Sequence, residues 1–177
     1  MTQREYVWRV LVLCLGAVIA CAANAGAQKV TSEADPGVDF SKYKTFAVRD
    51  GDMNSPAPAL NGELTKKRIV AAIESALVEK GLTKNDAKPD LNVFFMLGTA
   101  AGTVREESPG GPLGRGLRVE RVPATRGNLV INLRDPSTRS LVWRGIASDD
   151  KANPIDISKK IEDWVRKVID KYPPKKK

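Results

Sequence analysis

The residue types that most often perform catalysis are nearly missing from this 177-residue chain. It has no histidine, and its two cysteines, Cys14 and Cys21, both lie near the start. Without histidine there is no Ser-His-Asp triad, no His-ligated zinc and no imidazole base. Hydrophobic residues make up 42% of the chain and charged residues 28%, which is typical of a globular protein. We therefore predict a non-enzymatic domain. A hydrolase with two converging carboxylates stays open as an alternative.

Three short segments have residues that could bind a ligand. Residues 111–116 read G-x-x-G-x-G, the reverse of a dinucleotide fingerprint, and no helix is predicted after them to bind phosphate. Residues 50–54 alternate oxygen-bearing side chains like a calcium loop, yet Ser55 stands where such a loop needs glycine. Asp149 and Asp150 are adjacent, so on an extended chain they point apart. We predict that residues 50–54 form a turn and that Asp149 and Asp150 are solvated. We expect no metal site, no cofactor site and no catalytic residue.

The first 27 residues have the three parts of an export signal. Arg4 and Arg9 precede an uncharged run over residues 10–23, and small residues end at Ala27 in an A-x-A pattern. The apolar run is shorter than the ~20 residues of a membrane-spanning helix. This pattern predicts cleavage after Ala27 and a domain in the periplasm.

Cys21 offers a second processing route. Residues 18–21 read Val-Ile-Ala-Cys, which resembles a permissive lipobox. In that case residues 1–20 are removed, and Cys21 is acylated and anchors the protein to the outer membrane. The well-formed A-x-A site favours cleavage after Ala27, and both routes remain open. Absence of cysteine after residue 21 fits an oxidising compartment in either case.

The chain is basic, with a formal net charge of +8. Its concentrated basic run, residues 175–177, is predicted to be a solvated tail. No aromatic and basic motif of the RNA-binding kind is present, so nucleic acid is not an expected partner. We expect envelope protein partners and, through Cys21, membrane attachment; the sequence identifies no small-molecule ligand.

Periodic apolar residues predict one domain over residues 28–174. A strand is expected near residues 39–49, followed by a turn-rich link over residues 50–58. Further strands are expected at residues 91–97, 129–134 and 141–147, with a turn at residues 135–138 that makes the last two a hairpin. A short edge strand is possible at residues 29–33.

Two amphipathic helices complete the pattern. The first is predicted to begin at Asn61 as N-cap and to end at Gly81, which suits the left-handed position past a helix. Its apolar residues lie close to one face and are Leu64, Ile69, Ile73 and Leu77. The second begins near Asn153 and Pro154. Its apolar stripe comprises Ile157, Ile161, Trp164, Val165, Val168 and Tyr172. Trp143 and Trp164 are predicted core residues.

The elements β-α-β-β-β-α predict an α/β (α+β) two-layer sandwich. Its mixed sheet of four to five strands should have both helices on one face. The other face should be mixed in polarity, with Asn92, Asn132 and Arg134 beside Phe94, Met96 and Val130. Residues 98–124 contain many glycines, prolines and arginines, so they are predicted to be a loop, either disordered or a partner-binding arm.

Five motifs are distinctive: residues 39–47 (DFSKYKTFA), 89–93 (PDLNV), 135–138 (DPST), 141–145 (LVWRG) and 172–174 (YPP). Together they resemble a bacterial envelope family known as domain of unknown function 4136. The resemblance spans about residues 30–174, and it implies export and an α/β fold. Members are commonly lipoproteins, which strengthens the case for Cys21. The chain departs from the family at Val48, where tryptophan is usual, and in its Gly-rich insertion. The family has no assigned site residues.

These observations lead to two expectations for function. The first is an exported cell-envelope protein that binds or scaffolds without catalysis. The alternative is a carrier or sensor of an amphipathic envelope ligand, a lipid or a glycan, held between the sheet and the loop.

Overall fold

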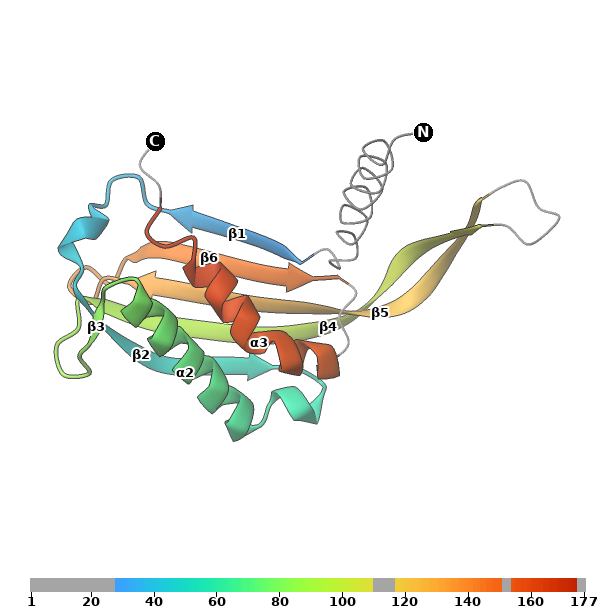
Figure 1. Ribbon diagram of the computed structural model, residues 1–177, viewed down its shortest axis with the longest axis horizontal. Coiled ribbons are helices and arrows are strands. Elements are labelled where there is room, and N and C mark those ends of the chain that lie inside the picture. Colours follow the sequence, from blue (N-terminus) through green and yellow to red (C-terminus); the bar gives the residue numbers. More distant parts are fainter. Residues whose placement is uncertain (1–27, 110–116, 151–153, 175–177) are drawn as a thin grey trace, which may run out of the picture.

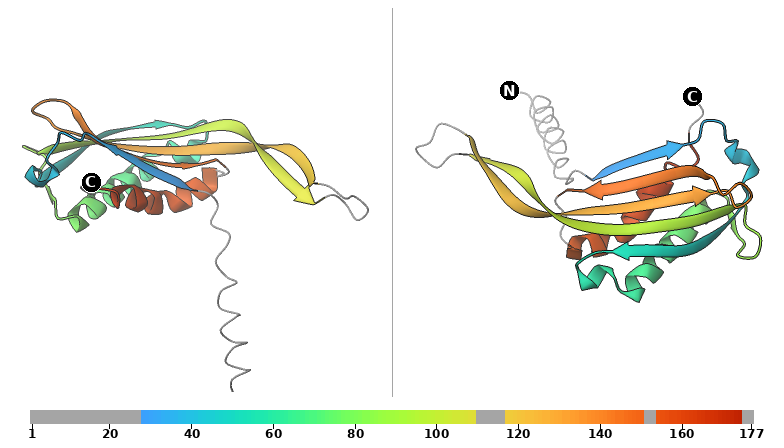
Figure 2. Two further views of the ribbon diagram at one scale, coloured as in Figure 1. Left: turned by 90° about the horizontal axis from the view of Figure 1, so that it is seen from above. Right: turned by 180° about the vertical axis from the view of Figure 1, so that it is seen from behind.

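The computed structural model describes residues 28–109, 117–150 and 154–174, with the side chains of Ala59 and of residues 101–109 and 117–124 left aside. These residues form one mixed six-stranded sheet with two helices on one face, as Figures 1 and 2 show. The predicted α+β two-layer class is confirmed, with more strands than expected. The predicted export segment 1–27 and the basic tail lie outside the described residues.

The sheet order is β1-β6-β5-β4-β2-β3. β2 (Thr45–Asn54) runs parallel to β4 (Leu91–Pro109) and to the two-residue β3 (Thr83–Lys84), and the other neighbours are antiparallel. Helix α2 (Glu63–Glu79) connects the parallel β2 and β4, since a parallel pair needs a crossover. The possible edge strand is confirmed as β1 (Lys29–Ala34). β3 was not predicted, because two residues leave no periodic signal.

The prediction of a loop was wrong for residues 98–109 and 117–124, and residues 110–116 lie outside the described residues. β4 continues to Pro109, and β5 (Leu117–Arg134) pairs with it from Gly98 and Asn128 to Pro109 and Leu117. β2 reaches only Gly98, and β6 (Leu141–Asp149) reaches only Gly127, so the rest of the hairpin projects beyond the sheet (Figure 1). We call this projection, residues 99–109 and 117–126, the arm. In the described part of the chain its strands have no outer neighbour, so glycine and proline are tolerated there.

Helix α2 follows its predicted pattern with two exceptions. Ile69, Ile73 and Leu77 are fully buried, but Leu64 is 74% exposed, because Thr65 occupies the inward position of the first turn. The N-cap is Gly62, without a side-chain bond, and Asn61 instead bonds the backbone of Ser55.

The predicted stop of α2 is confirmed. Gly81 has φ of +88°, in the left-handed region that favours glycine. The Leu82 amide donates to the Leu77 carbonyl at 3.1 Å and the Gly81 amide to the Val78 carbonyl at 2.9 Å, which is the Schellman pattern. Lys80 is the C-cap.

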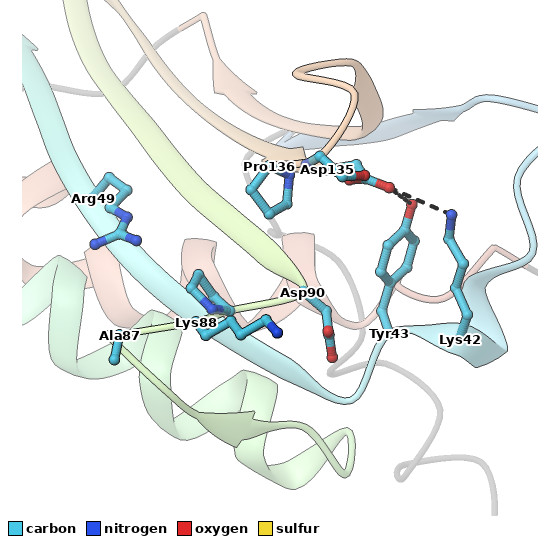
Figure 3. A pocket seen from close by; sticks show the side chains of 10 residues that line it. Lys42, Tyr43, Arg49, Ala87, Lys88, Asp90, Asp135 and Pro136 are labelled. Carbon is cyan, nitrogen blue, oxygen red and sulfur yellow. Dashed lines mark hydrogen bonds and ion pairs between the residues drawn. The ribbon is translucent and has the colours of Figure 1, made fainter.

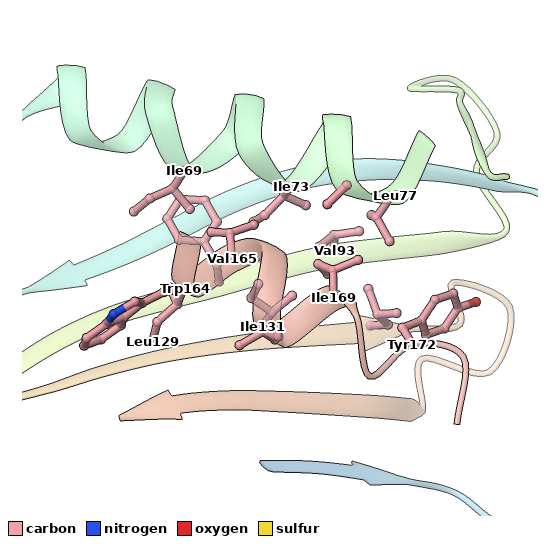
Figure 4. Packing of buried hydrophobic residues seen from close by; sticks show 14 of the residues in the cluster. Ile69, Ile73, Leu77, Val93, Leu129, Ile131, Trp164, Val165, Ile169 and Tyr172 are labelled. Carbon is pink, nitrogen blue, oxygen red and sulfur yellow. The ribbon is translucent and has the colours of Figure 1, made fainter. Parts of the chain in front are cut away.

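The predicted stripe is buried along α3 (Pro154–Ile169) and at Tyr172, just beyond its end, and Figure 4 shows Trp164 and Val165 among the buried side chains of the helices and the sheet. Trp143 and Trp164 are core residues, each 1% exposed. A Cβ on Gly145 would overlap Trp143 and Val168, so the chain needs glycine here for close packing of α3 on β6. Neither described helix has the length and hydrophobicity of a membrane-crossing segment. Asn153, the expected cap, lies outside the described residues.

The sheet face opposite the helices is mixed in polarity, as predicted. Met96 is 49% exposed, and Phe94 and Val130 are half-buried. Asn132 is buried and accepts a hydrogen bond from Arg144 Nε at 2.9 Å. This face therefore combines apolar side chains with basic and amide groups.

Candidate functional site

Three of the sequence motifs meet at one end of the sheet, where they line an open cleft of about 600 Å³ (Figure 3). Asp90 precedes β4, Asp135 follows the antiparallel β5, and Tyr43 precedes β2, which is parallel to β4. Strand direction alone therefore places the three residues at the same end, although they are distant in sequence. The cleft is lined by Lys42, Tyr43, Arg49, Ala87, Lys88, Pro89, Asp90, Asp135, Pro136 and Ser137.

Asp135 is a buried carboxylate with both oxygens engaged. Its Oδ1 accepts from the Ser137 amide at 2.8 Å, the Ser137 hydroxyl at 2.5 Å and the Thr138 amide at 3.4 Å, which forms the predicted turn. Its Oδ2 accepts from the Tyr43 hydroxyl at 3.0 Å and from Lys42 Nζ at 3.4 Å. The Ser137 hydroxyl, followed by the other donors, holds the pKa of Asp135 well below its usual range. This carboxylate therefore stays ionised at neutral pH.

Asp90 fastens the start of β4 to the start of β2. Its Oδ2 accepts from the amides of Lys44 and Thr45, both at 2.9 Å. In return, the Asp90 amide donates to the Thr45 hydroxyl at 2.9 Å. The hydrogen bond from the Lys44 amide is the main reason that the pKa of Asp90 is lowered. Asp90 is thus also ionised, and its bonds are structural.

Lys42 and Tyr43 form the opposite wall of the cleft from Lys88 (Figure 3). Burial raises the pKa of the Tyr43 hydroxyl, so it remains a donor to Asp135 at neutral pH. The hydrogen bond with Tyr43 raises the pKa of Lys42, whose ammonium lies 4.7 Å from the Tyr43 ring centroid. The pKa values of Lys42, Tyr43, Asp90 and Asp135 are thus all shifted away from neutrality.

Arg49 lies on the sheet face opposite the helices. Val48 packs on the core and is the register partner of the buried Val93, so strand alternation turns Arg49 to the other face. A bulge with one extra residue on β2 follows, between Val48 and Gly51. Arg49 Nε donates to Asn92 Oδ1 at 2.7 Å, and Nη2 donates to the Asp86 carbonyl at 3.5 Å. The guanidinium is therefore held by neutral oxygen atoms.

Two of the three segments that resembled ligand sites lie outside the cleft. Residues 50–54, predicted to be a turn, are instead the last part of β2, because their backbone pairs with β4 through Asn54. Asp150 forms an ion pair with Arg126 at 2.6 Å at the other end of the sheet, and Asp149 ends β6. The glycine motif at residues 111–116 lies outside the described residues.

Cys21 and Ala27, the two expected processing positions, also lie outside the described residues. Within residues 28–109, 117–150 and 154–174, no three Cys, Asp or Glu side chains are grouped so that they could hold a metal ion. Three of the motifs noted in the sequence contribute residues to the cleft, whereas Arg49 and Lys88 belong to none of them and were not predicted. The available signal was that each motif stands at a predicted strand end.

Comparisons with known proteins support the fold and the family. A PDZ domain protein from Parabacteroides distasonis has a similar structure, with a TM-score of 0.59 and 22% identity. The match covers 85% of this chain and 36% of that protein, so this chain spans about a third of its length. This likeness shows a shared fold.

Two further structures match less closely. One is a PelC dodecamer from Paraburkholderia phytofirmans, with a TM-score of 0.47 and 11% identity over 80% of this chain and 94% of that one. The other is a homolog of a neuraminyllactose-binding hemagglutinin from Helicobacter pylori, with a TM-score of 0.49 and 12% identity over 80% and 92%. No curated protein matches the sequence. A family model matches residues 30–174, most of the chain, and the protein therefore belongs to the family described as domain of unknown function (DUF4136).

Proposed function

We propose that this protein is an exported component of a bacterial cell envelope that acts by binding and not by catalysis. The observation that carries the proposal is the cleft at the end of the sheet. Its two carboxylates are hydrogen-bonded and have lowered pKa values, so neither can serve as the protonated acid of a carboxylate hydrolase. The cleft instead offers fixed charges and rigid walls, which suit recognition of a ligand.

Export rests on the sequence of residues 1–27 and its two processing routes. β1 begins at Lys29, level with the base of the arm, because Lys29 pairs with Ser148, Ser148 with Asn128, and Asn128 with Gly98. The cleft lies at the other end of the sheet, where β4 begins and β5 ends. If Cys21 is lipidated, the cleft therefore faces away from the anchored end of the domain. The intact mass of the protein from its native envelope separates a diacylated start at Cys21 from a start at Gln28.

Scaffolding is a second candidate activity, and the arm favours it. Beyond Gly98 and Gly127, each arm strand pairs only with the other within the described residues. Both outer backbone edges are therefore open, and an open edge can accept a strand from another protein. An envelope protein partner that adds a strand to the arm is the interaction we propose.

Carriage of an amphipathic ligand inside the domain is less well supported. The space between the sheet and the helices is occupied by Trp143, Trp164 and Phe95, each 1% exposed. Residues 98–124, the expected covering loop, are largely hairpin. A lipid or glycan would therefore bind at the surface, in the cleft or on the open face.

Photocrosslinking in the envelope tests the binding function. A photoreactive amino acid replaces Ala87 in the cleft, Val119 in the arm or, as a control, the exposed Lys160 on α3. We expect a specific adduct at Ala87 or Val119 that is absent at Lys160. Equal labelling at all three positions, or none, would contradict the proposal.

A further inference from the structure

Arg49 is held in place without a carboxylate partner among the described residues. Arg49 Nε donates to Asn92, and Nη2 donates one hydrogen to the Asp86 carbonyl. The other hydrogens on Nη1 and Nη2 are therefore available to a ligand. The Asp86 carboxylate lies 3.8 Å from Lys84. A guanidinium oriented by neutral acceptors keeps its full positive charge for a ligand.

Lys88 is the second cation of the cleft that has no acidic partner in the described part of the chain. Asn85 Oδ1 accepts from the amides of Ala87 and Lys88 at 3.2 and 3.1 Å, and the Asn85 amide donates to the Phe46 carbonyl at 2.8 Å. The turn that bears Lys88 is thus fixed to β2, the strand that bears Arg49. Both cations line the same cleft (Figure 3).

Three cations and two carboxylates line the cleft, namely Lys42, Arg49, Lys88, Asp90 and Asp135. Asp135 is paired with Lys42 and also bonds Tyr43 and the turn that follows. Asp90 Oδ2 accepts two backbone amides. The three positive and two negative side chains leave a formal net charge of +1, which favours an anionic ligand.

We propose that this cleft binds an anionic oxygen group, a phosphate or a carboxylate, through Arg49 and Lys88. The guanidinium fork and an ammonium group are the standard protein partners of such groups. Pro89 and Pro136 supply apolar walls that could contact the rest of the ligand. The inference rests on the proposed binding function and names the class of its ligand.

The anionic group could belong to a lipid headgroup or to a free small molecule. The open cleft of about 600 Å³ is large enough for either. Its position opposite the start of β1 means that an anchored protein would present it away from the membrane that holds it. A free molecule is the source that this geometry favours, and the test includes both.

Titration of the purified ¹⁵N-labelled protein tests the proposal. Inorganic phosphate and acetate are added at constant ionic strength, and amide shifts are followed by NMR. Vesicles of phosphatidylglycerol, with phosphatidylcholine as reference, report the lipid source by co-sedimentation. Two variants test the cleft: the single variant Lys88→Gln and the double variant Arg49→Gln/Lys88→Gln. The charge-matched control is the double variant Lys159→Gln/Lys160→Gln, at two exposed positions of α3.

We expect saturable amide shifts at residues 85–90, or binding to the anionic vesicles. The double cleft variant should weaken the binding affinity at least about tenfold, and the control should weaken it less than about twofold. Lys88→Gln removes no described contact, so a loss there cannot be attributed to misfolding. Equal effects of cleft and control variants, or no saturable binding to any probe, would overturn the proposal. If the crosslinking probe at Ala87 still gives a specific adduct when no anionic probe binds, the binding function survives with a different ligand class.

Discussion

The Tyr43 hydroxyl donates to Asp135 Oδ2 at 3.0 Å and joins segments 92 residues apart in the chain. Both residues are buried, each 6% exposed. Asp135 lies at the end of β5, and Tyr43 lies before β2, so this bond ties two strand ends of the sheet together beside the cleft. A single hydroxyl thus supports both the fold and the shape of the candidate site.

Tyr43→Phe should lower the free energy of unfolding by about 1–3 kcal/mol, because it leaves a buried carboxylate with one donor fewer. Urea denaturation at neutral pH measures the change. Tyr172→Phe is the matched control: Tyr172 is also buried, but its hydroxyl donates to no other described residue. The control should lose about 0.5 kcal/mol or less. Similar losses in the two variants would show that the hydroxyl of Tyr43 is not special.

Stability should fall in acid because Asp90 and Asp135 have lowered pKa values in the folded state. Their contribution is complete above the pKa of about 4 that carboxyls have in an unfolded chain, and it is lost as pH falls from there toward the folded values. Urea denaturation between pH 6 and pH 3 should therefore give a smaller acid loss for Asp135→Asn than for the natural protein. If the free energy of unfolding falls equally with pH in the variant and the natural protein, the ionised Asp135 does not stabilise the fold.

Gly145→Ala should destabilise the domain by about 1–3 kcal/mol, since the new methyl group would overlap Trp143 and Val168 in the core. Gly98→Ala is the comparison, because its Cβ would lie 3.7 Å from the Asn54 carbonyl, an ordinary contact. That variant should change stability by less than about 0.5 kcal/mol. Thermal unfolding of both variants decides whether close packing, and not glycine in a strand as such, is what matters.

Replacing residues 101–125 with Asn-Gly should leave the domain folded. Ala100 and Arg126 are register partners, so a two-residue turn can close the hairpin there. The rest of the sheet pairs only with residues outside the replaced segment. We expect a loss of less than about 1 kcal/mol in thermal unfolding, together with loss of envelope partners in crosslinked pull-downs. Unfolding of the variant would show that the arm is part of the core, and unchanged partners would remove its binding role.

The sequence predicted the helices and the central strands well, because those residues face the core. Buried faces must repeat with the period of their element, and the α3 stripe from Ile157 to Tyr172 does so. Gly81 marked the stop of α2 through its left-handed backbone. The two-residue β3 is too short to give such a signal, and the arm extends beyond the sheet, where no periodic apolar face is required. The prediction placed Leu64 on the buried face because it considered only hydrophobic residues, whereas the buried residue of the first turn is Thr65.

The cleft shows most clearly what local sequence cannot decide. Residue types alone excluded histidine chemistry and predicted the turn that begins at Asp135. The tertiary structure decided that Tyr43, Asp90 and Asp135 share one end of the sheet, because that depends on strand direction and pairing. It also placed Arg49 on the sheet face opposite the helices with neutral partners, so that its charge, with that of Lys88, faces the cleft. Periodicity and turn chemistry act over a few residues, whereas a binding site is assembled by contacts between distant segments of the chain.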